Sequence, residues 1–229
     1  MDFSQFHEKG YQVIEQVYSQ SEITSLLETL EDAGVSKSFG VREVLFRHPE
    51  LRDKVFSKNL LALITQLLPT CTQAIKSIYF DKPPHANWIV NWHQDLTINL
   101  ANSREQSNYK NWRVNQERVV VQPDIQLLES IVTIRIHLDD CTAQNGALRV
   151  IESSHQKGVI PIKDWMQNKA GREVVCEAAK GSVLVMKPLL LHSSRRTENA
   201  ALRRVLHLEF TDQNLPNGLR WKEAVELGS

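Results

Sequence analysis

The sequence predicts a mainly β (α+β) protein in which helices pack on the outside of a β-sandwich or barrel. Helical patterns are confined to the amino-terminal part, whereas from Ala74 onward short segments rich in β-branched and aromatic residues follow one another. Many short strands after a helical beginning are typical of sandwiches and barrels. Turn signals separate most of these segments, namely Pro83-Pro84, Asn145-Gly146, Lys180-Gly181 and Asn199-Ala200.

Two helices are predicted before the first strand. Ser19 and Glu22 have the spacing of a capping box. An apolar stripe at helical spacing follows them and consists of Ile23, Leu26, Leu27 and Leu30. A second helix is expected over about Glu50 to Leu68, and Pro69 would end it.

The remaining elements are short strands and one long polar segment. The predicted strands are Ala74–Phe80, Trp88–His93, Val119–Val121, Ile131–Leu138, Ala147–Ile151, Val174–Glu177, Ser182–Met186 and Arg203–Phe210. The polar segment Ala101 to Asn115 is expected to be a long loop, and loops of that length are often lids or binding loops.

Composition and charge exclude several classes of protein. The chain has 229 residues, and its 27 Lys and Arg balance its 27 Asp and Glu. A net charge of zero provides no global field for nucleic acid or for an anionic membrane. No apolar run approaches the roughly 18 residues of a membrane span, and the first residues lack the pattern of a secretion signal. The expected partner is a small-molecule substrate, without nucleic acid or membrane.

Cysteine usage and chain organisation indicate one cytoplasmic domain. Cys71, Cys141 and Cys176 are odd in number and widely spaced, which does not fit a disulfide framework. A reducing, cytoplasmic setting is therefore expected. The sequence has no internal repeat and no linker rich in Pro, Gly or Ser, so we expect residues 1–229 to form a single domain. No feature of the sequence indicates an oligomeric state.

A His-x-Asp pair in the second predicted strand is a candidate metal site. Side chains alternate faces along a strand, so His93 and Asp95 would lie side by side. One such pair and a second histidine make the facial triad of non-haem Fe(II) oxygenases, which leaves coordination positions open for co-substrate and O2. His192, at the end of a long apolar run, is a candidate for that second histidine.

Spacing alone leaves two choices open. His137 and Asp139 form a second His-x-Asp pair, and Asp139 could equally end a strand at a polar turn. Arg203 and Arg204 open the last strand, and an arginine there could bind the distal carboxylate of a dicarboxylate co-substrate. Alternation groups Arg203 with Val205, His207 and Glu209, but it does not decide which of the two arginines faces a pocket.

Four ordered segments together resemble the phytanoyl-CoA dioxygenase family of Fe(II)/2-oxoglutarate-dependent oxygenases. With the opening Gly10-Tyr-Gln-Val-Ile14, the similarity covers about residues 6 to 211. One departure is Glu152-Ser-Ser-His155, where the family commonly has Pro-Gly-Ser-His, and we interpret His155 as a structural hydrogen-bonding residue. The segments are Phe80-Asp-Lys-Pro through Asn87-Trp to Trp92-His-Gln-Asp95, Arg135-Ile-His-Leu-Asp-Asp140 through Asn145-Gly-Ala-Leu-Arg-Val150 to Ser154-His155, Gly181-Ser-Val-Leu through Pro188-Leu-Leu-Leu-His192 to Ser194, and Arg203-Arg-Val-Leu-His-Leu-Glu-Phe210.

The resemblance implies a fold and a cofactor. The family fold is a double-stranded β-helix, a jelly-roll, cupin-like barrel with flanking helices. The cofactors would be Fe(II), 2-oxoglutarate as co-substrate and O2, with release of succinate and CO2.

The resemblance also implies a set of site residues. The Trp-His-Gln-Asp context selects His93 and Asp95, with His192 as the third metal ligand. Arg203, eleven residues after His192, would bind the 5-carboxylate of 2-oxoglutarate with the support of Ser194. The last two candidate residues for binding co-substrate or substrate are Thr133 and Arg135, which should face the barrel interior.

The substrate and the retention of catalysis stay open at this stage. Acyl-CoA would require a basic groove, which the neutral chain does not indicate, so a small metabolite is favoured. The segment Leu96 to Gln122 is the expected specificity lid, with Trp112 and Arg113 as contacts. Two other hypotheses are a relative that binds metal and 2-oxoglutarate without full turnover, and a cupin-like metalloenzyme that does not use 2-oxoglutarate.

Overall fold

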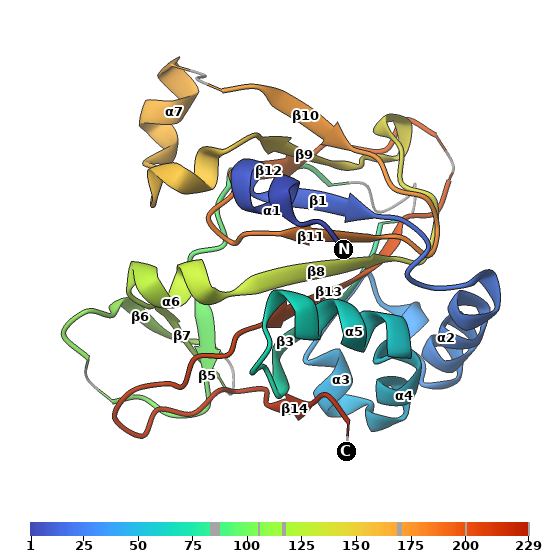
Figure 1. Cartoon of the computed structure of the whole chain (residues 1–229), viewed down its shortest axis with the longest axis horizontal. Helices are drawn as coiled ribbons and strands as arrows, with labels where there is room; N and C mark the ends of the chain where they lie inside the picture. The colour runs from blue at the N-terminus through green and yellow to red at the C-terminus, as the bar shows by residue number, and fades with distance from the viewer. Residues whose placement is uncertain (83–87, 105, 116–117, 169–170, 200, 229) are drawn as a thin grey trace.

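A large antiparallel sheet forms one of the two main layers of the molecule. The structure, a computed structural model, describes residues 1–229 except 83–87, 105, 116–117, 169–170, 200 and 229. Among the described residues this sheet has seven strands in the order β1-β11-β8-β13-β3-β14, and β2 pairs with β3 (Figure 1). The strands are β1 (Tyr11–Ile14), β2 (Gly40–Arg42), β3 (Gln73–Asp81), β8 (Val132–His137), β11 (Val183–Met186), β13 (Arg204–Phe210) and β14 (Val225–Glu226).

A smaller antiparallel sheet lies against one face of the large sheet. Its order is β10-β9-β12-β4, and its pairing brings His192 opposite His93. Figure 1 shows β10, β9 and β12 beside β1, β11 and β8, with the two layers of a double-stranded β-helix, or jelly roll. The strands are β4 (Val90–His93), β9 (Leu148–Ile151), β10 (Glu173–Cys176) and β12 (His192–Ser194).

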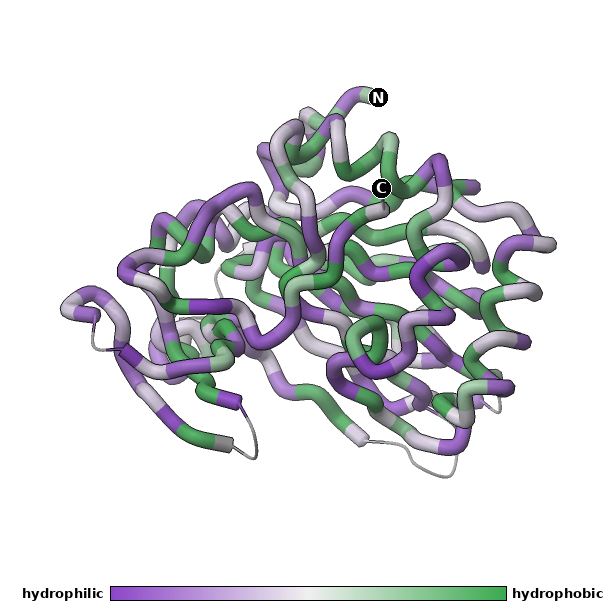
Figure 2. Tube along the Cα trace, turned by 90° about the horizontal axis from the view of Figure 1, so that it is seen from below, coloured by the Kyte–Doolittle hydropathy of each residue, from purple (hydrophilic) through white to green (hydrophobic). Residues whose placement is uncertain are grey.

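A third sheet replaces the predicted long loop. The segment Ala101 to Asn115 was expected to be loop, and this expectation is wrong in its second half because Lys110–Asn115 is strand β6. It pairs with β7 (Arg118–Gln122), which also pairs with β5 (Ile98–Leu100). This sheet projects from one side of the molecule in two perpendicular views (Figures 1 and 2). The expected lid is therefore a small β-sheet rather than an irregular loop.

Helices cover the outer face of the large sheet. Alternation along β8 and β13 sends Ile134, Ile136 and Leu206 outward, where they join one apolar cluster with Leu26 and Leu60 of the helices. The side chains between them therefore point to the opposite, inner face. Figure 2 shows apolar residues in the strands of the body and hydrophilic residues in its outer segments. The helices are α1 (Ser4–Lys9), α2 (Gln20–Asp32), α3 (Val44–Arg47), α4 (Arg52–Val55), α5 (Lys58–Leu67), α6 (Ile125–Ser130) and α7 (Ile162–Asn168), with 3-10 turns Val35–Lys37, Pro49–Leu51, Ala143–Asn145 and Ser154–Lys157.

One predicted helix is confirmed and the other is wrong as a single element. In α2 the Ser19 side chain accepts from the Glu22 amide and the Glu22 carboxylate accepts from the Ser19 amide, so the capping box forms. The expected helix over Glu50 to Leu68 is instead a 3-10 turn followed by α4 and α5. Ser57 interrupts it because its side chain accepts from the Leu60 amide and caps α5 as a new helix.

The strand predictions hold for the body of the jelly roll, and the structure adds strands that they omitted. All eight predicted strands correspond to observed ones, while β1 and β12 are short strands that the sequence pattern did not indicate. The predicted Pro83-Pro84 turn and Ala200 lie outside the described residues. In the part of the chain that is described, no helix combines the length and apolar character that a membrane crossing requires.

Candidate active site

The two sheets of the jelly roll enclose a cavity of about 250 Å³. Its walls come from the inner faces of β3, β8 and β13 on one side and from β4, β9 and β12 on the other. Alternation explains this, because the inward positions of β13 are Val205, His207 and Glu209. The cavity is lined by Arg42, Lys76, Ile78, Phe80, Trp88, Val90, His93, Asp95, Thr97, Arg135, Leu148, His192, Ser194, Arg203, Val205, His207 and Glu209.

In the lining of this cavity, the structure brings His93, Asp95 and His192 together. Pairing of β4 with β12 places the two imidazole rings 4.1 Å apart between centroids. The carboxylate of Asp95 lies 3.8 Å from Nε2 of His93 and 3.6 Å from Nε2 of His192. One ligand atom of each residue lies within 4.8 Å of the others, which suits a shared metal ion.

Hydrogen bonds orient both imidazoles for metal binding. Nδ1 of His93 lies 2.8 Å from the Asn91 carbonyl oxygen, and Nδ1 of His192 lies 2.8 Å from the Leu190 carbonyl oxygen. A proton on each Nδ1 satisfies these carbonyls and leaves each Nε2 with a free lone pair toward Asp95. Such outer contacts fix the tautomer of metal-binding histidines.

The charge states of the site also fit a divalent metal. Burial lowers the pKa of His192 to about 4, so its ring is neutral at physiological pH and available as a ligand. Burial alone would raise the pKa of Asp95, but the electrostatic interactions with His192, His207 and Lys76 outweigh it and hold this pKa below its usual range. Oδ2 of Asp95 is buried without a hydrogen-bond partner among the described residues, as expected for an oxygen that binds a cation.

Gln94 fixes the turn that carries the first two candidate ligands. Its Nε2 donates to the carbonyls of Gly158 and Leu189 at 2.8 and 2.6 Å, and its Oε1 accepts from the amide of Ile160 at 2.8 Å. The Asp95 amide donates to the Pro188 carbonyl at 2.9 Å. The strand end that carries Asp95 is thereby tied to the segment that leads into His192.

A second set of possible metal ligands also includes Asp95, but its other two members have partners of their own. His207 and Glu209 also lie within metal-ligand distance of Asp95. However, Glu209 accepts from Nζ of Lys76 at 2.7 Å and contacts Nε2 of His207 at 3.2 Å, while Nη1 of Arg135 lies 3.1 Å from Nδ1 of His207. Both ring nitrogens of His207 are therefore engaged. The group of His93, Asp95 and His192 is the better candidate for a metal ion.

The second His-x-Asp pair does not form a metal site. Asp139 accepts from the backbone amide, Nε and Nη2 of Arg204 at 2.7 to 2.9 Å. His137 is buried on β8, and burial followed by the charge of Arg135 lowers its pKa to about 3. The structure therefore places Asp139 in a structural ion pair. It also resolves the parity of the last strand, because Arg204 faces Asp139 while Arg203 lines the cavity.

The predicted co-substrate residues lie in or beside the cavity. Arg203 is buried, its Nε has no hydrogen-bond partner among the described residues, and Ser194 lines the same cavity. Arg135 also lines it and is buried. Thr133 shares the inner face of β8 with Arg135 but does not line the cavity, and its buried Oγ1 has no described partner.

The expected contacts from the lid segment point elsewhere, and His155 is structural. Trp112 packs against the apolar cluster of the third sheet. With Arg113, it lines a separate hollow beside Ser103 and Arg104. Nε2 of His155 lies 3.3 Å from the carbonyl oxygen of His7 in the amino-terminal segment.

Sequence reasoning did not identify Arg42, Lys76 and Gln94 as site residues. Arg42 and Lys76 belong to strands with no motif, and only their pairing with other strands places them at the cavity. Gln94 lies inside the His-x-Asp motif, so its position was a usable signal. His207 and Glu209 alternate onto the same face of the last strand as Arg203, and this alternation was a signal that could have placed them in the cavity.

A model of the phytanoyl-CoA dioxygenase family matches residues 6–205 of the chain. The chain belongs to the phytanoyl-CoA dioxygenase family. A search of curated proteins finds no match. The conserved order of sequence segments and the double sheet of the structure thus agree on this family.

Several solved structures have a fold similar to that of this chain. The non-haem α-ketoglutarate-dependent carbocyclase SnoK from nogalamycin biosynthesis has a TM-score of 0.70 at 16% identity, covering 91% of this chain and 81% of that one. AviO1 from Streptomyces viridochromogenes Tue57 has a TM-score of 0.68 at 18% identity, covering 94% and 95%. HygX from Streptomyces hygroscopicus, with nickel and 2-oxoglutarate bound, has a TM-score of 0.64 at 14% identity, covering 92% and 86%. At these identities the likeness establishes the fold.

Proposed function

We propose that this chain is an Fe(II)- and 2-oxoglutarate-dependent dioxygenase that hydroxylates a C–H bond of a small molecule. The observation that carries the proposal is the arrangement of one cavity, with His93, Asp95 and His192 grouped together and the guanidinium of Arg203 in its wall. Family membership supports it. So do the similar folds of HygX structures that contain iron or 2-oxoglutarate with nickel.

The metal ligands would be Nε2 of His93, Nε2 of His192 and a carboxylate oxygen of Asp95. A ferrous ion with 2-oxoglutarate and O2 supplies the oxidising chemistry and yields succinate and CO2. The protein orients the two imidazoles through the carbonyls of Asn91 and Leu190 and holds Asp95 ionised. The rest of the cavity is available for co-substrate and substrate.

Arg203 would bind the distal carboxylate of 2-oxoglutarate. A buried guanidinium without an acidic partner is unfavourable unless an anion compensates it. Burial lowers the pKa of Arg203, yet the group remains cationic at physiological pH. Its planar donors match a carboxylate bidentately, and Ser194 offers a hydroxyl in the same wall. Arg135 would add a second positive charge beside them.

The test is succinate formation by the purified chain supplied with Fe(II), 2-oxoglutarate and O2. We expect slow succinate release without substrate and faster release when a substrate from a small-molecule panel is added. His192→Ala should abolish release, and an exposed variant such as Arg172→Gln should leave it unchanged. Full turnover by His192→Ala would overturn the proposal.

The same experiment separates the other two hypotheses. A relative with lost turnover would bind Fe(II) and 2-oxoglutarate without releasing succinate. A cupin-like metalloenzyme would bind metal without affinity for 2-oxoglutarate and would leave Arg203 without a role. Equilibrium binding of both ligands, measured beside turnover, therefore distinguishes all three.

A further inference from the structure

The wall opposite the candidate metal ligands carries more positive than negative charge. Lys76 and Glu209 form an ion pair at 2.7 Å and compensate each other. Arg135 donates to a neutral imidazole rather than to a carboxylate, and its Nε has no hydrogen-bond partner among the described residues. Buried charges are normally paired, because an isolated one loses its hydration. Arg135 therefore remains uncompensated within the protein.

The proposed cofactors do not remove this excess. A ferrous ion and Arg203 together balance Asp95 and the dicarboxylate 2-oxoglutarate. Arg135 and Arg42 then remain as the uncompensated charges among the residues that line the cavity. The loaded site would therefore still present a positive field to an incoming substrate.

Arg42 lies on the cavity side at its exposed rim. In the pairing of β2 with β3, Arg42 is opposite Ile78, and paired residues of neighbouring strands present their side chains on the same face. Ile78 and Arg42 both line the cavity. Within the described part of the chain, no carboxylate lies within ion-pair distance of Arg42.

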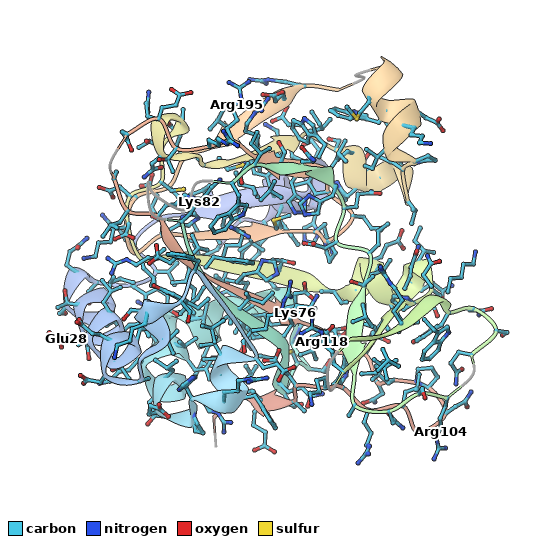
Figure 3. The ribbon with its side chains drawn as sticks, turned by 180° about the vertical axis from the view of Figure 1, so that it is seen from behind. Glu28, Lys76, Lys82, Arg104, Arg118 and Arg195 are labelled. Carbon is cyan, nitrogen blue, oxygen red and sulfur yellow. The ribbon has the colours of Figure 1, made fainter. Side chains whose placement is uncertain are left out.

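Arg118 lies on the third sheet, on the face away from its apolar cluster. Ile98 of β5 and Val121 of β7 pack into the apolar cluster, so alternation places Asn99 and Arg118 on the other face. Figure 3 shows Lys76 and Arg118 extending from different sheets. Nζ of Lys76 donates to the Thr97 carbonyl just before β5, which joins this face to the cavity wall. Burial, and then the positive charge of Arg118, lowers the pKa of Arg42.

An arginine without a described acidic partner at a cavity rim can bind an anion, and the nearby charge of Arg118 adds to the positive field there. Nε of Arg118 is buried and has no described hydrogen-bond partner. Guanidinium groups bind carboxylates and phosphates bidentately. The cavity lining also contains Phe80, Trp88 and Leu148, which favour an apolar body.

We propose that the substrate is a small organic anion with an apolar body, whose carboxylate or phosphate group binds Arg42 at the cavity rim, with Arg118 as a second nearby cation. The assignment rests on the proposed oxygenase function. It adds that the anionic group lies at the rim while the carbon to be oxidised points toward His93, Asp95 and His192. Arg118 belongs to β7 of the third sheet, so that sheet would contribute to substrate binding through a strand rather than through a loop.

The experiment measures binding to the Ni(II)-loaded protein saturated with 2-oxoglutarate, by calorimetry. The probes are two pairs, phenylacetate with phenylacetamide, which are nearly isosteric, and benzyl phosphate with benzyl alcohol, which share the benzyl body and differ by the phosphate group. The variants are Arg42→Gln and Arg118→Gln, singly and together. The control is Arg172→Gln, which removes the same charge from a side chain that is 76% exposed and lies outside the cavity.

We expect at least one anion to bind at least about tenfold more tightly than its neutral partner, and the double variant to lose this preference. The pair that discriminates shows whether the group is a carboxylate or a phosphate. Affinity for 2-oxoglutarate should stay unchanged in all variants. Equal behaviour of anion and neutral partner in both pairs, or full anion affinity in the double variant, would overturn the assignment.

Binding of 2-oxoglutarate is measured first, so that the two proposals fail separately. A protein that does not bind 2-oxoglutarate refutes the oxygenase function and the substrate assignment with it. A protein that binds 2-oxoglutarate but does not discriminate between the paired probes refutes the substrate assignment alone.

Discussion

The chain contains the pattern His-x-Asp twice, and the two copies have different structures. His93 is the last residue of β4, an edge strand of the four-stranded sheet as described, and Asp95 lies two residues beyond it, where their polar atoms converge with His192. His137 is the last residue of β8, an interior strand of the large sheet, and Asp139, two residues beyond it, binds Arg204. A two-residue spacing therefore does not define a metal site; the elements around its end do.

The middle residue of each copy shows the difference most clearly. Gln94 makes three hydrogen bonds to neighbouring loops and fixes the segment between His93 and Asp95. Leu138 is fully buried in the apolar core beneath the helices. One copy is thus built around a polar anchor at the site, and the other around core packing. This comparison leads to four predictions.

The largest effect should come from the two adjacent arginines at the start of the last strand, of which only Arg204 contacts the second His-x-Asp pair. Arg203→Ala should weaken 2-oxoglutarate binding by about 2–5 kcal/mol, because it removes the cation from a buried anion site. Arg204→Ala should leave that affinity nearly unchanged, since Arg204 faces Asp139. Calorimetric titration of the Ni(II)-loaded variants checks this. Equal losses in both variants would show that the parity we assign to the last strand is wrong.

Replacing Gln94 should lower both the stability of the chain and the metal affinity of the His93-x-Asp95 pair. Gln94→Leu would leave the carbonyls of Gly158 and Leu189 and the amide of Ile160 without their partner. We expect a loss of about 1–3 kcal/mol in unfolding free energy and about tenfold weaker Ni(II) binding, as for other residues that position metal ligands. Urea unfolding and metal titration measure the two effects. Unchanged metal affinity would limit Gln94 to a role in stability.

Breaking the second copy should change stability without changing the site. Asp139→Ala removes a partly buried, bidentate ion pair with Arg204. The expected loss is about 1–3 kcal/mol of unfolding free energy, because charge-assisted hydrogen bonds are lost. Metal affinity should stay within a factor of two or so of wild type. A large loss of metal affinity in this variant would argue that the second copy supports the site.

The buried histidine of the second copy should make stability sensitive to acid. Its pKa is about 3 in the folded chain, against about 6.5 when unfolded. The unfolded state therefore binds the additional proton between these values, and stability falls as pH drops below about 6.5, by up to about 1.4 kcal/mol per pH unit. His137→Leu should reduce this slope. Unfolding curves from pH 7 to pH 5 measure it, and an unchanged slope would contradict the burial argument.

Much of the body of the jelly roll could be predicted from the sequence, because its strands are short, β-branched and separated by turn residues. The capping box of α2 was equally local. The break at Ser57 was missed because the apolar residues on both sides continue at helical spacing, and a cap inside such a run leaves no gap in the pattern. Strand β6 was missed because most of its residues, Lys110–Asn115, are polar, although Trp112 and Val114 alternate with polar neighbours.

The candidate site was less accessible to sequence reasoning than the fold. Local spacing offered His93 and His137 equally, and the family resemblance was needed to choose between them. The choice between Arg203 and Arg204 required the register of β13 against β8. Arg42 and Arg118 lie on separate sheets and belong to no motif, so only the folded chain places Arg42 at the cavity and the charge of Arg118 near it.

The account rests on the identity of the metal ligands, and anaerobic equilibrium dialysis tests it most directly. The wild-type chain and His137→Ala should each bind one ferrous ion and one molecule of 2-oxoglutarate per chain. His93→Ala, Asp95→Ala and His192→Ala should each bind neither with comparable affinity. Retention of ferrous iron and 2-oxoglutarate by these three variants, or their loss in His137→Ala, would contradict it.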